Sequence, residues 1–203
     1  MENEFVCSLP RYLQTADNET ALIASALAGD LESFNCLALA YQNLIYNVAF
    51  RILGERFAAE DAAQETFILA FRKLGAFRGG SFRGWLLRIV TNACYDELRH
   101  RKRHPTSRLE TEDEIESPKW MVDPGKSPEE ELERVELART IQACMDKLPL
   151  EYRLVVVLAD IQGLDYAETA EALGLPLGTV KSRLARARAW LSVCMQGIDG
   201  RGI

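Results

Sequence analysis

The chain of 203 residues is 48% hydrophobic and 27% charged, which fits one large or two small domains of an ordinary globular protein. Charged residues interrupt any apolar core near the start, and no stretch approaches the roughly 18 apolar residues of a membrane span. We therefore expect no secretory signal and no membrane contact, and a cytoplasmic location. Ala, Leu, Glu and Arg dominate and alternating strand patterns are rare, so the sequence predicts an all-α fold.

The net charge of −6 conceals an uneven distribution. Residues 72–103 hold nine Arg or Lys against two acids, and residues 178–191 hold four bases and no acid. Between them, residues 104–136 hold eleven acids against four bases. Two basic segments that flank an acidic one indicate nucleic-acid binding despite the negative total.

The first half of the sequence predicts a tail and then four helices. Residues 1–20 show weak periodicity and are interpreted as a loosely ordered tail. A helical pattern begins near Ala21. Asp30 is the expected N-cap of the second helix and Gly54 its end.

A third helix is predicted over residues 58–74 and a fourth over residues 82–102, separated by a glycine-rich loop. The expected apolar stripe of the third helix is Ala63, Phe67, Ala70, Phe71 and Leu74. The expected buried stripe of the fourth helix is Trp85, Leu86, Ile89, Ala93 and Leu98.

A change of composition separates the two halves of the sequence. Residues 105–127 are rich in proline and acids, lack periodicity and predict a flexible acidic linker. The run Ser127-Pro128-Glu129-Glu130 then combines an N-cap, a first-turn proline and acids at the positive end of a helix dipole, which marks a helix start. Pro149 opens a further helix that carries an apolar run.

Residues 163–191 have the pattern of a helix-turn-helix. A short helix with the small apolar face Ala167, Ala170 and Leu173 ends at Gly174. The second helix is expected to bury Val180, Leu184, Ala187 and Leu191. Its other side and its flanks present the candidate contacts to a DNA major groove, namely Thr179, Lys181, Ser182, Arg183, Ala185, Arg186 and Arg188. A solvated basic face on an ordinary helical hairpin is the weaker interpretation, because the turn, the small residues and the acid-free face all agree.

Aromatic and basic side chains alternate along residues 77–103, a combination that holds single-stranded DNA. Cations contact phosphates, and the Asn92 amide can hydrogen-bond the edge of a flipped base. The candidate residues are Arg78, Phe82, Arg83, Trp85, Arg88, Asn92, Arg99, Arg101, Lys102 and Arg103. Trp85 lies in an apolar stripe, which favours a core position for it.

A polar patch precedes this segment at Glu60, Asp61, Gln64 and Glu65. Three of its members share one helix face by their spacing. The patch is interpreted equally well as compensation of the helix dipole or as a docking site for a basic partner.

The five cysteines, Cys7, Cys36, Cys94, Cys144 and Cys194, show no metal-ligand spacing. In a reducing cytoplasm they are expected to be small apolar fillers of helix faces, without a metal or other cofactor.

Three stretches, in this order, resemble the extracytoplasmic-function (ECF) sigma factors, the smallest class of the sigma-70 family. Residues 59–67 resemble region 2.2, residues 77–103 resemble regions 2.3 and 2.4, and residues 148–188 resemble region 4. Two details depart from the pattern, because Ala62-Ala63 and Ala185 stand where larger residues are common. The resemblance covers about residues 21–195.

The resemblance implies a non-enzymatic sigma factor that directs core RNA polymerase to promoters and helps to open the −10 element. It assigns polymerase docking to Glu60, Asp61, Gln64, Glu65 and Ile68, the −10 element to the candidates in residues 77–103, and the −35 element to those in residues 179–188. The implied partners are the beta-prime clamp helices and beta flap of the polymerase, promoter DNA and an anti-sigma factor.

The predicted organisation is an N-terminal tail (1–20), a region 2 domain (21–104), a linker (105–127), a region 4 domain (128–197) and a C-terminal tail (198–203). Two other functions compete with this interpretation. A stand-alone helix-turn-helix regulator needs a dimer interface or ligand pocket, and no segment suits either. A nucleic-acid enzyme needs a metal cluster, a phosphate-binding loop or an activated nucleophile, and none is evident.

Overall fold

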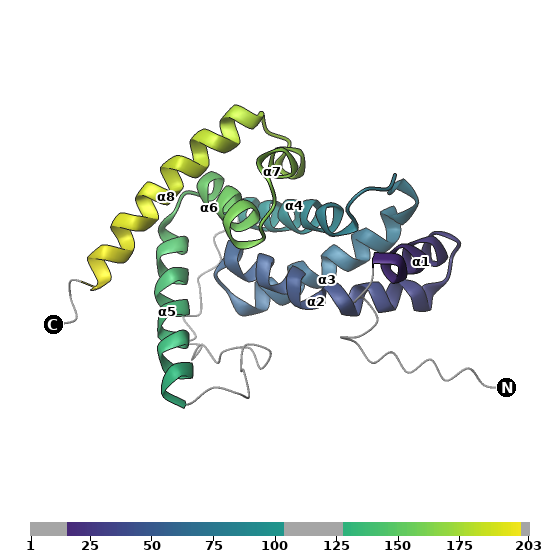
Figure 1. The fold of residues 1–203 in the computed structure, drawn as a ribbon, viewed down its shortest axis with the longest axis horizontal. Helices are drawn as coiled ribbons and strands as arrows, with labels where there is room; N and C mark the ends of the chain where they lie inside the picture. Colours follow the sequence, from purple (N-terminus) through teal and green to yellow (C-terminus); the bar gives the residue numbers. More distant parts are fainter. Residues whose placement is uncertain (1–15, 104–127, 200–203) are drawn as a thin grey trace.

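The structure, a computed structural model, describes residues 16–103 and 128–199 (Figure 1). These ranges are helical, with short connections and no strand among the described residues. The all-α prediction is confirmed. The predicted acidic linker and most of the predicted N-terminal tail lie outside the described residues.

The first half of the chain packs three helices around a central one, α2. The bounds are α1 Ala16–Leu27, α2 Leu31–Leu53, α3 Arg56–Lys73, the 3-10 turn η1 Leu74–Ala76 and α4 Phe82–Arg103. The first helix begins at Ala16, five residues before its predicted start, so it includes the end of the predicted tail.

Two residues set the ends of α2, as predicted. The Asp30 carboxylate accepts hydrogen bonds from the backbone N–H groups of Glu32 and Ser33 at 3.2 and 3.3 Å, which caps the first turn. The Ser33 hydroxyl also donates to Asp30, and this bond lowers the pKa of the carboxyl. Gly54 ends the helix with a left-handed φ of 70°, and its N–H donates to the Phe50 carbonyl.

The buried face of α3 differs from the predicted stripe. Phe71 is 49% exposed, whereas Ala70 and Leu74 are buried as predicted. The residues of α3 that face the core are small, namely Ala58, Ala59, Ala62, Thr66 and Ala70. Small side chains bring two helix axes closer together, so α3 and α2 pack tightly and the large aromatic residue stays outside.

The buried face of α4 is also rotated slightly from the prediction. Leu86 is buried as expected, whereas Trp85, Ile89 and Leu98 are only partly buried. The buried residues are Phe82, Leu86, Leu87, Val90, Thr91 and Cys94. Cys94 therefore fills a helix interface, as predicted for the cysteines in general.

The second half of the chain contains the predicted helix-turn-helix. The bounds are α5 Pro128–Lys147, α6 Leu150–Val156, the π-helical segment η3 Val157–Ile161, α7 Tyr166–Leu173 and α8 Leu177–Asp199. Asp165 and Glu168 form a capping box at the start of α7, and left-handed Gly174 ends it. α8 buries Val180, Leu184 and Ala187 as predicted.

The inner face of α7 is shifted from the prediction. Thr169 and Ala172 are its buried residues, whereas Ala167 is exposed. Ala170 and Leu173 are partly buried against the core. The buried residues of α7 are nevertheless small, as a close helix crossing requires.

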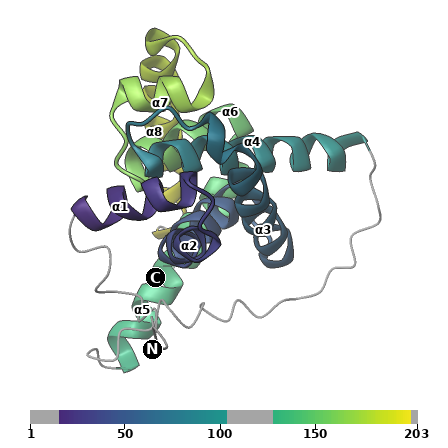
Figure 2. The ribbon, with the colours of Figure 1, turned by 90° about the vertical axis from the view of Figure 1, so that its right-hand side faces the viewer.

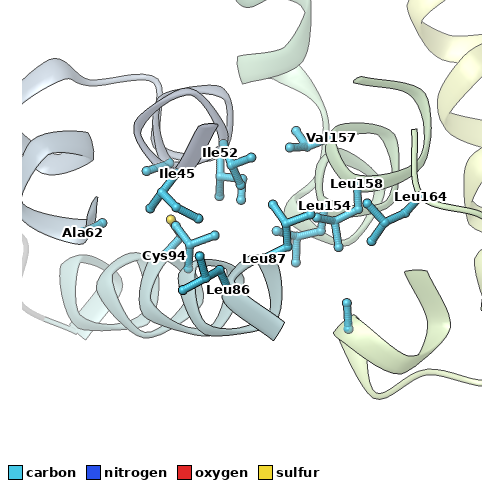
Figure 3. Packing of buried hydrophobic residues seen from close by; sticks show 14 of the residues in the cluster. Ile45, Ile52, Ala62, Leu86, Leu87, Cys94, Leu154, Val157, Leu158 and Leu164 are labelled. Carbon is cyan, nitrogen blue, oxygen red and sulfur yellow. The ribbon is translucent and has the colours of Figure 1, made fainter. Parts of the chain in front are cut away.

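One continuous hydrophobic core joins the two halves of the chain. Figure 3 shows Ile52 and Leu87 of the first half beside Leu154, Val157 and Leu158 of the second. α2 contacts α5 and α6, and α4 contacts α7. The sequence predicts two helical domains, but it does not predict that they pack directly against each other.

A buried arginine connects the halves through helix ends. Arg153 of α6 donates from Nη1 to the Ile52 carbonyl and from Nη2 to the Asp146 carbonyl, both at 2.6 Å. These carbonyls lie in the last turns of α2 and α5, where the helix provides no hydrogen-bond partner. Burial lowers the pKa of Arg153, and the Asp146 carboxylate partly offsets this effect.

Candidate nucleic-acid interface

The first half of α8 presents an exposed basic face. Five predicted contacts are exposed, namely Lys181, Ser182, Ala185, Arg186 and Arg188, and Thr179 and Arg183 lie partly buried at the edges. The Ser182 hydroxyl donates to the Thr179 carbonyl at 3.0 Å. The Lys181 ammonium lies 5.7 Å from the centre of the Tyr166 ring of α7, a cation–π contact that orients it. This is the geometry of a recognition helix supported from behind by α7.

Arg188 differs from the other predicted contacts on α8. Its Nε donates to the Asp160 carboxylate of η3 at 3.0 Å, and this hydrogen-bonded ion pair raises the pKa of Arg188. A contact with a DNA phosphate would have to compete with this internal pair. Arg186, two residues earlier on the exposed face, has no such competitor among the described residues.

A second exposed face runs along α4. The predicted contacts Arg88, Asn92, Arg99, Lys102 and Arg103 are all exposed, and the first four follow one another at spacings of four, seven and three residues along one side of the helix. Sequence reasoning missed Tyr95, which lies on the same face and is 43% exposed. The Arg99 guanidinium lies 5.7 Å from its ring centre. Tyr95 could have been predicted from the sequence, because it lies between Asn92 and Arg99 at helical spacing. The basic end of α4 extends beyond the packed helices (Figure 2).

The start of α4 carries an aromatic cluster. Phe77, Phe82 and Trp85 have ring centres 5.4 to 5.6 Å apart, and Tyr41 of α2 lies 5.8 Å from Phe82. Phe82 is only 3% exposed, which corrects its predicted role from a DNA contact to a buried support of the preceding loop. Trp85 is partly buried in the same cluster, closer to the core interpretation of this residue.

Four predicted arginine contacts of residues 77–103 make hydrogen bonds within the chain, namely Arg78, Arg83, Arg101 and Arg103, the last from Nε to the Arg99 carbonyl at 3.3 Å. Arg83 donates from Nη2 to the carbonyl and side-chain oxygens of Gln162, at 2.6 and 3.2 Å, and so joins α4 to the second half. Arg101 forms ion pairs with Glu55 at 2.6 Å and Glu97 at 2.7 Å. These pairs hold Arg101 beside the start of α3, so a contact with a DNA phosphate would have to compete with them. Arg78 is exposed in the loop and donates to the Gly75 carbonyl at 3.3 Å.

The predicted docking residues gather on the outer side of α3. Glu60, Asp61, Gln64, Glu65 and Ile68 are all exposed. Glu60 forms an ion pair with Arg56 at 3.0 Å, which partly neutralises it. Asp61 and Glu65 therefore provide the accessible negative charge of this surface.

An apolar groove between α2 and α3 adjoins these residues. Its volume is about 420 Å³, and it is lined by Leu31, Phe34, Asn35, Ala38, Leu39, Gln42, Gln64, Phe67, Ile68, Phe71 and Arg72. Of these, only Gln64 and Ile68 were predicted to dock a partner. The groove follows from the inward small-residue face of α3, because that face leaves Phe71 and Ile68 outside.

Two negative findings apply to the described residues. None of the helices in 16–103 and 128–199 is long and apolar enough to span a membrane. The same ranges contain no group of three or more His, Cys, Asp or Glu residues arranged to hold a metal ion.

Family models match both halves of the chain. Residues 37–104 match the model described as Sigma-70 region 2, and residues 138–191 match the model described as Sigma-70, region 4. The first match contains the α3 docking residues and the α4 face. The second contains the helix-turn-helix.

Curated relatives extend these matches along most of the chain. The ECF RNA polymerase sigma factor SigE of Mycolicibacterium smegmatis is 37% identical over 89% of this chain and 69% of its own length. The RNA polymerase sigma-H factor of Pseudomonas aeruginosa is 35% identical over 90% of this chain and 96% of its own. The ECF sigma factor SigW of Bacillus subtilis is 38% identical over 79% of this chain and 87% of its own.

Two solved structures share the fold. CnrH, in complex with the cytosolic domain of CnrY, aligns with a TM-score of 0.65 at 28% identity and covers 88% of this chain and 97% of its own. The Bartonella quintana sigma factor RpoE, in complex with the anti-sigma factor NepR, aligns with a TM-score of 0.66 at 23% identity over 82% and 98%. Sequence, family models and fold therefore agree that the chain belongs to the ECF sigma factors of the sigma-70 family, subunits that direct RNA polymerase to promoters.

Proposed function

We propose that this chain performs no bond chemistry and acts by holding core RNA polymerase and two promoter elements at once. The observation that carries the proposal is the coexistence of three exposed surfaces. These surfaces are the α2–α3 groove with its acidic rim, the α4 face around Asn92, and the α8 face around Lys181 and Arg186.

Docking on the polymerase is assigned to the groove and its rim. An apolar groove beside exposed carboxylates fits an amphipathic helix with basic residues at its edge. We assign this surface to the beta-prime clamp helices, with Ile68 and Phe71 as apolar contacts and Asp61 and Glu65 as charged ones. The beta flap is a second proposed contact, with the α5–α8 half.

Promoter contact is assigned to the two cationic faces. On α8, Lys181, Ser182 and Arg186 are assigned to the −35 duplex, where they contact base edges and phosphates. On α4, Asn92 is assigned to a flipped base of the −10 element, with the surrounding cations on the phosphates.

The packed arrangement of the halves implies that they separate when the promoter is bound. Elements centred at −35 and −10 lie about 25 base pairs apart, or roughly 85 Å of B-form duplex. A domain of this size has a radius of gyration of only about 12 Å. Two such domains that share a core do not reach both elements at once. Polymerase docking would therefore supply the free energy that opens the Arg83–Gln162 contact and the core beneath it.

An inhibitory protein is a further proposed partner. CnrH, at 28% identity, was solved with the cytosolic domain of a second protein, CnrY. This precedent supports a protein that holds the two halves of the present chain together. We place the chain in the cytoplasm because polymerase and promoter DNA are there.

The decisive experiment mixes the pure chain with core RNA polymerase and follows the complex by gel filtration. The variant Asp61→Lys/Glu65→Lys reverses the accessible charge of the rim and is expected to lose the complex. Its matched control, Glu136→Lys/Glu151→Lys, makes the same change of charge at exposed positions of α5 and α6, outside the groove and its rim, and is expected to weaken the complex much less. A folded wild-type chain that does not bind the polymerase would overturn the proposal in favour of a stand-alone DNA-binding regulator.

A further inference from the structure

A disulfide between two cysteines that are far apart in the sequence joins α5 to α8. Cys144 and Cys194 are separated by 50 residues, and their Cα atoms lie 6.0 Å apart, the usual spacing for a disulfide, which the structure contains. Cys144 is completely buried, whereas Cys194 is partly exposed. The expectation that these cysteines are only apolar fillers is therefore wrong for this pair.

The other described cysteines differ from this pair in their surroundings. Cys94 is a buried thiol, and burial raises its pKa to about 12. Such a thiol stays protonated near neutral pH and is a poor first target for an oxidant, because the thiolate is the nucleophile. Cys36 is a thiol on α2, in the first half of the chain. Among the described cysteines, Cys144 and Cys194 are the two whose sulfur atoms lie close enough to form a disulfide on oxidation.

The position of the disulfide connects the recognition helix to the contact between the halves. Cys194 lies in the second half of α8, beyond the DNA-facing residues. Cys144 lies on α5 between Gln142 and Asp146, one turn of helix that faces the first half of the chain. Gln142 accepts a hydrogen bond from Arg51 of α2 at 3.4 Å and donates to Asp146 at 3.0 Å. The bond therefore fixes α8 to the turn of α5 that contacts α2.

We propose that Cys144 and Cys194 form a reversible, peroxide-sensitive redox site whose oxidised state fixes the second half of the recognition helix to α5. The proposal goes beyond promoter recognition and rests only on the proposed cytoplasmic location, where permanent disulfides are rare and reversible ones report the redox state. Cys194 is the member that an oxidant reaches, and Cys144 is the resolving thiol.

The reaction balances with hydrogen peroxide as the oxidant. The Cys194 thiolate attacks one peroxide oxygen, the O–O bond breaks, and the leaving hydroxide takes a proton to become water. The Cys144 sulfur then attacks the Cys194 sulfenic sulfur, and its thiol proton passes to the departing hydroxide, which leaves as a second water. Two electrons pass from the two sulfurs to the peroxide. A cellular dithiol reverses the step by exchange and becomes a disulfide itself.

The test uses the whole chain, reduced and then exposed to hydrogen peroxide. After the remaining thiols are alkylated, peptide mass spectrometry should find a Cys144–Cys194 linked peptide. A thioredoxin system should then remove the link. Hydrogen exchange in the second half of α8 should be at least threefold slower in the oxidised chain, with exchange in α3 unchanged. The oxidised chain should also melt at least about 5 °C higher.

Two variants distinguish oxidation of the Cys144–Cys194 pair from oxidation of other cysteines in the chain. Cys194→Ser should lose both the linked peptide and the difference in exchange, whereas the matched control Cys36→Ser should keep them. The wild-type comparison of oxidised and reduced chain needs no substitution, so a poorly folded variant does not decide the result. Absence of the linked peptide from oxidised wild-type chain overturns the proposal. A link that the thioredoxin system does not reduce overturns it as well, because the disulfide is then permanent.

Discussion

Gly54 of α2 lies directly against the Asp146 carboxylate of α5, at the junction of the two halves of the molecule. A Cβ atom at Gly54 would lie 2.6 Å from Asp146 Oδ1, well inside the contact distance of real Cβ atoms. The carboxylate is held in place, because it accepts a hydrogen bond from Gln142 at 3.0 Å and pairs with Arg153 at 3.5 Å. The absence of a side chain at Gly54 thus serves two purposes, the left-handed helix end and the close approach of α5.

Replacing Gly54 with alanine is expected to destabilise the chain more than the left-handed backbone alone explains. Gly29→Ala is the matched control, since Gly29 also has a positive φ, of 100°, but nothing lies within 4 Å of a Cβ there. Each substitution should cost about 1 kcal/mol of backbone strain, and Gly54→Ala should cost about 1 kcal/mol more. Urea unfolding of both variants measures the difference.

A double-mutant cycle identifies the source of that extra cost. Asp146→Ala in the Gly54→Ala background removes the carboxylate that the new methyl group would meet. The two substitutions should then be less than additive, with a coupling free energy of about 1 kcal/mol. Strict additivity would mean that α5 does not approach Gly54 as closely as the structure has it.

Arg153 is expected to be the polar residue that contributes most to the contact between the halves. Its side chain is 11% exposed, and its guanidinium binds the Ile52, Asp146 and Leu148 carbonyls at the ends of α2 and α5. Arg153→Met keeps most of the volume but leaves these carbonyls without their donor. The free energy of unfolding should fall by about 2–3 kcal/mol, as for other hydrogen bonds to a charged group.

The control for Arg153 is Lys147→Met, an exposed change of the same charge, which should stay within about 0.5 kcal/mol of wild type. A small-angle scattering measurement complements the unfolding curve. If Arg153 ties the halves together, the variant should be more extended than the wild type. Equal stability and equal size would show that the apolar core alone joins the halves.

A substitution in the α2–α3 groove is expected to weaken polymerase binding without affecting folding. Phe71 is exposed and contacts Phe34 at the groove wall, with ring centres 5.1 Å apart. Phe71→Glu places a charge at the wall without burying it, so the melting temperature should change little. Binding to core polymerase should weaken at least tenfold, measured by fluorescence anisotropy. Phe57→Glu, at an exposed apolar position outside the groove lining, should bind as the wild type does.

The sequence was most informative where local chemistry decides the structure. Asp30 and Gly54 set the ends of α2, and the exposed and buried sides of the first half of α8 match the prediction, because caps, turns and periodicity are encoded within a few residues. The buried face of α3 was predicted wrongly, because a prediction from periodicity gives most weight to large apolar residues. In the folded chain the helix is instead held by Ala59, Ala62 and Thr66, which allow a close approach.

No pattern within a short stretch of the sequence predicts the contacts between the two halves. Arg153 and Ile52 are 101 residues apart, and Arg83 and Gln162 are 79 apart. Cys144 and Cys194 likewise lack a spacing motif, since a disulfide needs proximity in space and not in sequence. Such relationships follow from how two amphipathic surfaces meet, which depends on the complete packing and not on any one segment.

The buried thiol of Cys94 predicts a dependence of stability on alkaline pH. Burial raises its pKa from 9.0 to about 12 in the folded chain. Between these values the unfolded chain releases the thiol proton while the folded chain retains it, so the free energy of unfolding falls as the pH rises above 9. Cys94→Ala should unfold with a smaller slope between pH 9 and 11. Equal slopes would show that Cys94 ionises as readily in the folded chain.

The two arginines near the middle of α8 are expected to differ in their effect on promoter binding. Both are exposed, but only Arg188 is paired with a carboxylate, that of Asp160, among the described residues. In the holoenzyme, Arg186→Gln should weaken binding to a promoter fragment and reduce the slope of log K against log salt by about one. Arg188→Gln should change that slope less, because its charge is already compensated. Lys147→Gln, outside both cationic faces, should leave affinity and slope unchanged. A larger loss for Arg188→Gln than for Arg186→Gln would mean that DNA displaces Asp160 from Arg188 and that η3 moves when the promoter is bound.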